Sequence, residues 1–137
     1  MTNEDIRTLA DLRLVLRQFQ SFSERAAEAR GLTTQQYQAL LAIKGEHSDT
    51  PITVTLLAQR LLIKHNSAVG LVDRMAELGL VVRRPSERDR RSVMVEITAR
   101  GESVFKRLAI AHRRELQRIA PLLGRHFRQL AKPGELG

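Results

Sequence analysis

Apolar side chains recur at intervals of three and four residues along most of the chain, the spacing of amphipathic helices. The pattern predicts a first helix over about residues 5–30, which Gly31 ends, and a second helix that begins at Thr33. Thr33 and Gln36 are three positions apart and form a capping-box pattern. Further helices are predicted over about residues 54–62, 64–78, 99–119 and 122–131, with Pro121 interrupting the last two.

The period of the pattern changes to two after Gly79. Residues 80–84 form a plausible strand, residues 93–97 alternate as a half-buried strand does, and the segment between them is polar. We therefore predict a mainly α fold with a small antiparallel β-hairpin wing.

The helices predicted over 54–62 and 64–78 are separated by one or two residues, which is the spacing of a helix-turn-helix. The second helix of such a pair can enter the major groove of DNA, where Asn pairs with adenine and Val contacts a thymine methyl. An ordinary helical hairpin with a polar outer face is the alternative. The exposed positions near the start of the second helix are Lys64, His65, Asn66, Ser67 and Val69.

The predicted hairpin is rich in arginine. Its tip and first strand carry five arginines and two acidic residues, a net charge of +3. An exposed basic loop between two strands can reach the narrow minor groove, where the potential is most negative. A solvated loop that prevents sheet association is the alternative. The charged positions are Arg83, Arg84, Glu87, Arg88, Asp89, Arg90 and Arg91.

The composition agrees with a polyanionic partner. The chain has 23 Lys and Arg against 15 Asp and Glu, a formal charge of +8, although such charge can also serve solubility alone. The lack of cysteine excludes disulfides and thiolate metal sites. No apolar run is long enough to span a membrane, and the N-terminus lacks signal-peptide features, so we expect a cytoplasmic protein. No catalytic motif is present, and we expect neither an enzyme nor a cofactor.

Short motifs between residues 33 and 101 narrow the interpretation. They are Leu57-Ala58-Gln59-Arg60-Leu61, Leu71-Val72-Asp73-Arg74-Met75, Gly79-Leu80-Val81, Arg84-Pro85, Asp89-Arg90-Arg91 and Ile97-Thr98-Ala99-Arg100-Gly101. Together they resemble the MarR family of bacterial transcriptional regulators. Three positions depart from the family pattern, because Lys64 stands at the helix cap, Gly70 replaces a larger residue and Leu62 replaces a common turn glycine.

The resemblance implies a homodimer that binds a roughly palindromic double-stranded operator and acts as a repressor released by a small effector. It implies one domain over 1–137, with a winged helix-turn-helix lobe at about 33–101 and dimerisation helices at about 5–30 and 99–131. It also implies that Arg91 enters the minor groove while Asp89 holds it. Arg74 is expected to contact phosphate or to brace the recognition helix.

The family often binds small aromatic acids or phenols near its dimerisation helices. Arg17, Phe19, Phe22, Tyr37 and His112 are the candidate effector residues, and each is equally compatible with ordinary packing. A zinc-responsive regulator is an alternative, since His112 and Glu115 are spaced as a weak ligand pair, although no metal site is predicted. The basic composition is also compatible with an architectural nucleic-acid-binding protein without sequence preference, and the departures at Lys64 and Gly70 with a protein-interaction module.

Overall fold

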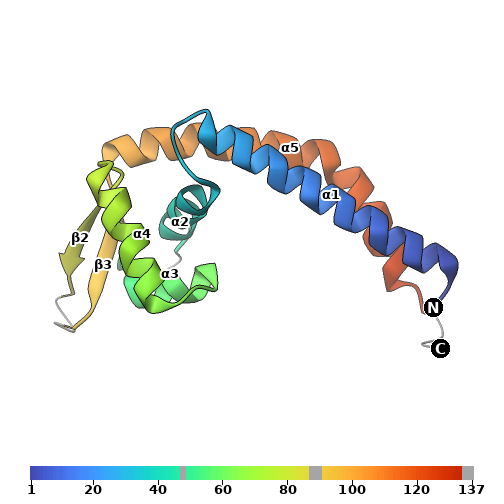
Figure 1. The fold of residues 1–137 in the computed structure, drawn as a ribbon, viewed down its shortest axis with the longest axis horizontal. Coiled ribbons are helices and arrows are strands. Elements are labelled where there is room, and N and C mark those ends of the chain that lie inside the picture. Colours follow the sequence, from blue (N-terminus) through green and yellow to red (C-terminus); the bar gives the residue numbers. More distant parts are fainter. Residues whose placement is uncertain (47–48, 87–90, 134–137) are drawn as a thin grey trace. The chain divides into compact units, whose positions relative to one another are not determined.

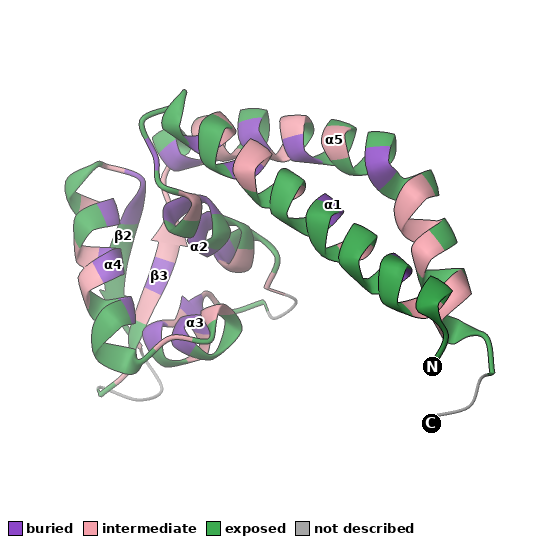
Figure 2. Ribbon diagram, turned by 45° about the vertical axis from the view of Figure 1, so that its right-hand side comes forward, coloured by how far each residue is buried: buried purple, intermediate pink, exposed green. Residues whose placement is uncertain are grey.

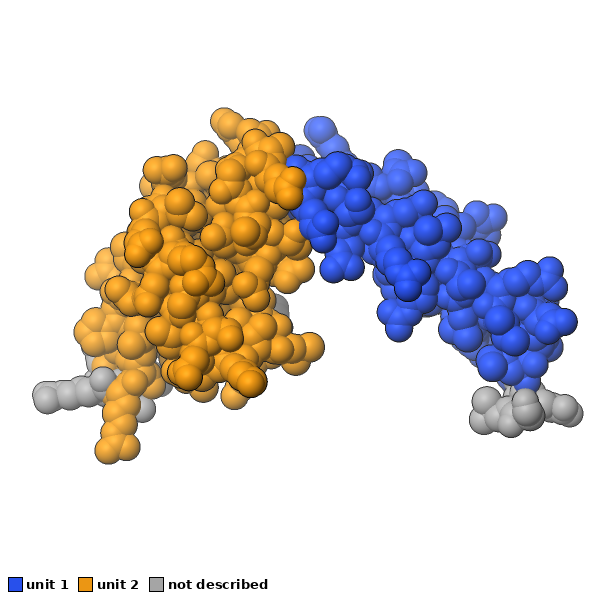
Figure 3. Space-filling view, viewed as in Figure 1, with its two compact units in different colours: residues 1–26, 110–137 blue, residues 27–109 orange. Residues whose placement is uncertain are grey.

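The computed structural model describes residues 1–46, 49–86 and 91–133. Two compact units are formed, one by residues 1–26 and 110–137 and the other by residues 27–109 (Figure 3). The fold is mainly helical with a small antiparallel sheet, which confirms the predicted fold class (Figure 1). The elements are α1 (Asn3–Glu28), α2 (Thr34–Lys44), β1 (Ile52–Thr53), α3 (Val54–Leu61), α4 (His65–Glu77), β2 (Val81–Pro85), β3 (Val93–Ile97) and α5 (Ala99–Ala131).

The first unit is an antiparallel pair made by α1 and the C-terminal part of α5 (Figure 1). Ser23 Oγ lies 2.7 Å from His112 Nε2 near one end, and Gln129 Nε2 donates to Asp5 Oδ1 at 3.5 Å near the other. Figure 2 shows that buried positions are sparse along α1. The exposed large apolar side chains of this unit are Met1, Ile6, Leu9, Leu14, Leu16, Ile110, Leu116 and Phe127.

The last helix is longer than the sequence pattern predicts. α5 continues through Pro121 without a break, so the predicted interruption there is wrong. Proline lacks an N–H group and thus removes only the helical bond to the carbonyl four residues earlier, that of Gln117. The helix turns on both sides of Pro121 are retained, and one continuous helix covers both predicted segments.

The second unit contains a three-stranded antiparallel sheet in the order β1-β3-β2. β2 and β3 pair as the predicted hairpin, with Val81 opposite Ile97 and Arg83 opposite Val95. The two-residue strand β1, which the sequence did not predict, pairs Ile52 with Val95. The hydrophobic core of this unit is aliphatic apart from Tyr37, and its largest fully buried side chains are Leu40, Ile52, Leu57, Leu71, Met75, Leu80, Leu108, Val72, Val81 and Val95.

Side-chain caps fix the starts of α2 and α3 in the second unit. Thr33 Oγ1 accepts from the Gln36 N–H at 3.1 Å while Gln36 Oε1 accepts from the Thr33 N–H at 3.0 Å, which confirms the predicted capping box. Thr53 Oγ1 caps α3 by accepting from the Leu56 N–H at 3.1 Å. Gly31, the predicted end of the first helix, has a φ of 75°, a conformation that glycine adopts without steric cost.

The start of α5 is held by a close backbone contact within the second unit. The Thr98 hydroxyl donates to the Gly79 carbonyl at 2.6 Å and accepts from the Gly101 N–H at 3.0 Å. The Thr98 N–H donates to the Leu80 carbonyl at 3.0 Å. A Cβ atom on Gly101 would lie 2.2 Å from that same carbonyl oxygen. Only glycine allows this approach, so Gly101 fixes the first turn of α5 against Leu80.

Candidate nucleic-acid interface

The turn between α3 and α4 contains a strained residue. Leu62 has φ 56° and ψ 41°, in the left-handed region, and its backbone N–H donates to the carbonyls of Ala58 and Gln59. Its side chain is 92% exposed, so no packing compensates for the strain. Leu62 thus adopts the left-handed conformation that glycine adopts without steric cost.

The two faces of α4 differ as an amphipathic recognition helix requires. Its inner face packs into the core of the second unit, where its apolar residues at helical spacing are buried, namely Ala68, Leu71, Val72 and Met75. The predicted DNA-contacting positions are all exposed, namely Lys64, His65, Asn66, Ser67 and Val69. The helix thus presents a polar first turn followed by one apolar side chain.

Lys64 occupies the N-cap of α4, as the sequence predicts, and its side chain makes no capping hydrogen bond. The first N–H groups of α4 therefore lack the side-chain acceptor that Ser, Thr or Asp supplies at this position. Further along α4, a Cβ on Gly70 would lie 3.4 Å from Arg74 Nη1. The Arg74 guanidinium thus lies beside the space that the missing side chain of Gly70 leaves.

The described part of the wing carries its arginines in different environments. Arg83 Nη1 on β2 donates to Asp73 Oδ1 on α4. Arg84 Nε, one residue further, donates to Glu96 Oε2 on β3 at 2.8 Å. Arg91 is exposed in the turn that precedes β3. Arg88, Asp89 and Arg90, which are predicted DNA contacts, lie outside the described residues.

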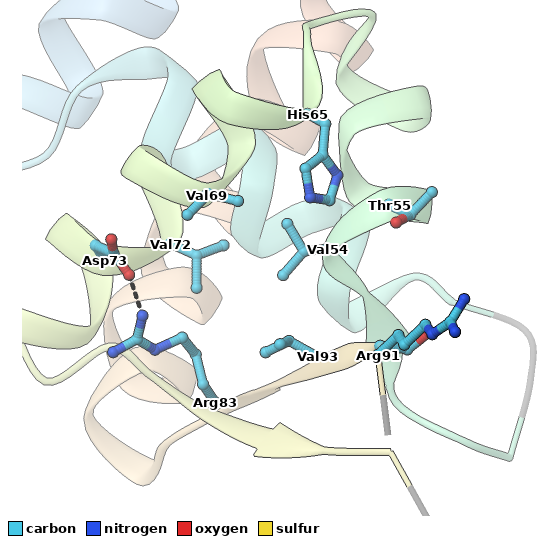
Figure 4. Close-up of a pocket in the computed structure, with 10 residues that line it drawn as sticks. Val54, Thr55, His65, Val69, Val72, Asp73, Arg83, Arg91 and Val93 are labelled. Atoms are coloured by element: carbon cyan, nitrogen blue, oxygen red, sulfur yellow. Dashed lines mark hydrogen bonds and ion pairs between the residues drawn. The ribbon is translucent and has the colours of Figure 1, made fainter. Parts of the chain in front are cut away.

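A cavity of about 100 Å³ lies between α4 and the hairpin. We call it the valine cavity because Val54, Val69, Val72 and Val93 line it. Figure 4 shows the polar side chains around these valines. They are Thr55, His65, Asp73, Arg83, Arg91 and Ser92. The cavity therefore adjoins both the exposed face of α4 and the root of the wing.

The structure groups three of the five predicted effector residues. In the first unit, the His112 ring contacts Phe19 and Phe22 edge-on, with centroid distances of 5.9 Å and 5.5 Å. His112 is buried and hydrogen-bonded to Ser23, a residue that no pattern in the sequence indicates. Arg17 is exposed on α1.

Tyr37 belongs to the second unit, where it stacks on Phe105 at 6.1 Å. Burial raises the pKa of the Tyr37 phenol above its ordinary value. Among the described residues, no group of three or more His, Asp or Glu side chains is arranged to bind a metal ion. The described helices include none that is long and apolar enough to cross a membrane.

The sequence model of the MarR family matches residues 30–92. Among curated proteins, the chain is similar to the transcriptional activatory protein BadR of Rhodopseudomonas palustris, with 41% identity over 85 residues. That match covers 62% of this chain and 49% of BadR. The chain thus spans about half the length of the curated relatives it matches.

Solved structures extend the similarity to almost the whole chain. AbsC of Streptomyces coelicolor, a MarR family transcriptional regulator, matches with a TM-score of 0.73 and 22% identity, covering 97% of this chain and 84% of AbsC. The transcriptional regulator MosR of Mycobacterium tuberculosis, solved in complex with DNA, matches with a TM-score of 0.63 and 23% identity, covering 89% of this chain and 91% of MosR. Residues 30–92 thus match the MarR family model, and the fold of almost the whole chain is similar to that of a solved MarR family regulator.

Proposed function

We propose that this protein binds specific sequences of double-stranded DNA as a homodimer and regulates transcription in the bacterial cytoplasm. The observation that carries the proposal is the position of the wing beside the recognition helix. His65 and Val69 from α4 and Arg91 from the wing line the same valine cavity. One lobe can therefore present an apolar and polar helix face to the major groove and an arginine to the adjacent minor groove.

The charge of the chain supports DNA as the partner. The formal charge of +8 favours a polyanion, and neutralised phosphates release counterions when such a protein binds. The exposed Asn66 and Ser67 supply hydrogen-bonding groups that can distinguish base edges. We propose that Lys64, whose side chain makes no capping bond, contacts phosphate rather than the helix end.

Selection of duplexes from a random pool by the purified protein tests sequence-specific binding. We expect enrichment of a roughly palindromic site whose halves are about 34 Å apart, one turn of DNA. The Arg91→Ala variant should bind the enriched duplex more weakly by about 1–3 kcal/mol. Arg107→Ala, which removes the same charge from an exposed position on α5, is the control. A pool without enrichment would instead favour architectural binding without sequence preference. Equal effects of the two substitutions on affinity would show that Arg91 does not contact the DNA.

The first unit supports the homodimer. Its apolar side chains include Leu14, which is 52% exposed, and Phe127, which is 54% exposed. A second copy of the helix pair would remove such surface from water, at about 25 cal/mol for each Å². Sedimentation equilibrium should give a dimer for the parent chain, and the double variant Leu14→Asp with Phe127→Asp should shift it towards the monomer.

We further propose that a small aromatic acid modulates DNA binding at Phe19, Phe22 and His112, where two aromatic faces meet a buried imidazole. Repression released by this ligand is the expected mode, although the relative BadR is described as an activatory protein. Benzoate and salicylate are suitable probes. Either should weaken DNA binding by the parent chain and leave a Phe22→Ala variant unaffected, and identical responses of the two proteins would exclude this site.

A further inference from the structure

Two neighbouring arginines of the wing are each paired with a carboxylate. Successive side chains of a strand point to opposite faces of the sheet, so Arg83 and Arg84 leave β2 in opposite directions. Arg83 pairs with Asp73 on α4, whereas Arg84 pairs with Glu96 within the hairpin. Only the first of these pairs connects the hairpin to the recognition helix.

The Asp73–Arg83 pair lies at the valine cavity. Asp73 and Arg83 both line that cavity, and the dashed line in Figure 4 joins them across its edge. The cavity lies between α4 and the hairpin, and the Asp73–Arg83 contact joins the two elements at its edge. This polar contact can therefore help to set their spacing.

The same cavity separates the proposed DNA contacts. His65 and Val69 reach it from α4, and Arg91 reaches it from the wing. Whatever fixes the width of this cavity also fixes how far the wing arginine lies from the helix that reads the major groove. Both side chains of the Asp73–Arg83 pair are about half exposed, so the pair contributes little to overall stability.

We propose that Asp73 is a positioning residue for DNA recognition, which holds the wing at the spacing that specific binding requires without contacting DNA itself. This inference rests on the proposed function. Asp73 also forms an ion pair with the Arg83 guanidinium, which could otherwise bind any DNA phosphate. Loss of the carboxylate should therefore reduce preference for the specific site while leaving binding to other DNA at least as tight.

The test compares Asp73→Asn with Glu96→Gln in the full-length protein. Both substitutions add one unit of positive charge and release one arginine of the same strand, but only the first breaks the contact with α4. The probes are the duplex enriched from the random pool and a duplex of the same composition in shuffled order. The ratio of the two dissociation constants measures preference.

We expect Asp73→Asn to reduce this ratio about two- to fivefold, the factor that corresponds to one exposed ion pair. On the shuffled duplex its log–log salt dependence should steepen by about 0.9 for each new phosphate contact. Glu96→Gln should leave the ratio unchanged, and the double variant Asp73→Arg with Arg83→Asp should restore it. Equal ratios for the two single variants, or no recovery in the double variant, would overturn the proposal.

A measurement without DNA separates this inference from the proposed function. The chain has no cysteine, so a protein carrying Asn66→Cys on α4 and Val82→Cys on β2 takes up spin labels at these two positions and nowhere else. The distribution of distances between the labels should broaden in Asp73→Asn and not in Glu96→Gln. An unchanged distribution would refute the positioning role even if the protein binds its duplex, whereas a pool without enrichment would count against the proposed function only.

Discussion

Replacing Gly101 by alanine tests the close backbone contact at the start of α5, which lies within the second unit. The added Cβ would lie 2.2 Å from the Leu80 carbonyl oxygen and 2.8 Å from Ile97 Cγ1. The carbonyl is backbone and already accepts from the Thr98 N–H, so it cannot move aside as a flexible side chain can. Overpacking of this kind costs about 1–3 kcal/mol. Alanine returns up to about 1 kcal/mol through its better helix propensity.

Subtracting this gain from the upper end of the cost leaves a net loss of about 2 kcal/mol. For a chain of this length the loss corresponds to a fall in Tm of roughly 6–8 °C. Thermal melting followed by far-ultraviolet circular dichroism measures the change, and urea denaturation gives the free energy of unfolding.

Gly70→Ala is the matched control, because it makes the same substitution inside α4. Its Cβ would meet only Arg74 Nη1 at 3.4 Å, the end of a flexible side chain. This variant should be more stable than the parent chain by about 1 kcal/mol. The reasoning is refuted if Gly101→Ala has the same Tm as the parent chain. It is also refuted if the two variants change stability in the same direction, because the close contact with Leu80 would then not govern the start of α5.

Two further predictions concern the strained turn and the single tyrosine. Leu62→Gly should raise the free energy of unfolding by about 1 kcal/mol, because it removes a left-handed non-glycine residue whose exposed side chain packs on nothing; a urea midpoint that stays constant or falls would contradict this. Absorbance at 295 nm reports Tyr37 alone in a chain with one Tyr and no Trp, and its titration midpoint should lie above 10.0 in the folded protein and near 10.0 in denaturant. Since only the unfolded chain then ionises readily, stability should decline as pH rises beyond about 10; coincident midpoints would exclude an effect of burial.

Local patterns in the sequence predict much of this fold. The Thr33–Gln36 box and the buried face of α4 depend on residues within one or two helical turns, and both are found as predicted. The two segments predicted as strands likewise form the hairpin. These features succeed because neighbouring residues alone decide them.

Other features depend on distant residues and could not be predicted. β1 exists because Ile52 finds Val95 on another strand, and no alternation is detectable in two residues. Leu41 of α2 is 47% exposed although it is apolar and follows the buried Leu40, because the packing partners of a helix decide how wide its buried face is.

The candidate interface follows from the sequence in part. The exposed first turn of α4 follows from its periodicity, and the wing arginines follow from composition. The pairing of Arg83 with Asp73 and of Arg84 with Glu96 follows from the hairpin register and from the approach of α4, which leave no signal in the sequence. The DNA contacts assigned to Arg84 and Arg91 remain predictions.

The division of the chain into units has a consequence for synthesis on the ribosome. The second unit is one continuous segment, whereas the first unit joins the two ends of the chain, as the contact between Asp5 and Gln129 shows. α1 ends at Glu28 and α5 at Ala131, so 103 further residues must be synthesised after α1 before its partner helix is complete. At cellular elongation rates this delay is roughly 5–20 s. During that time the apolar side of α1 is a natural client for chaperones that bind nascent chains.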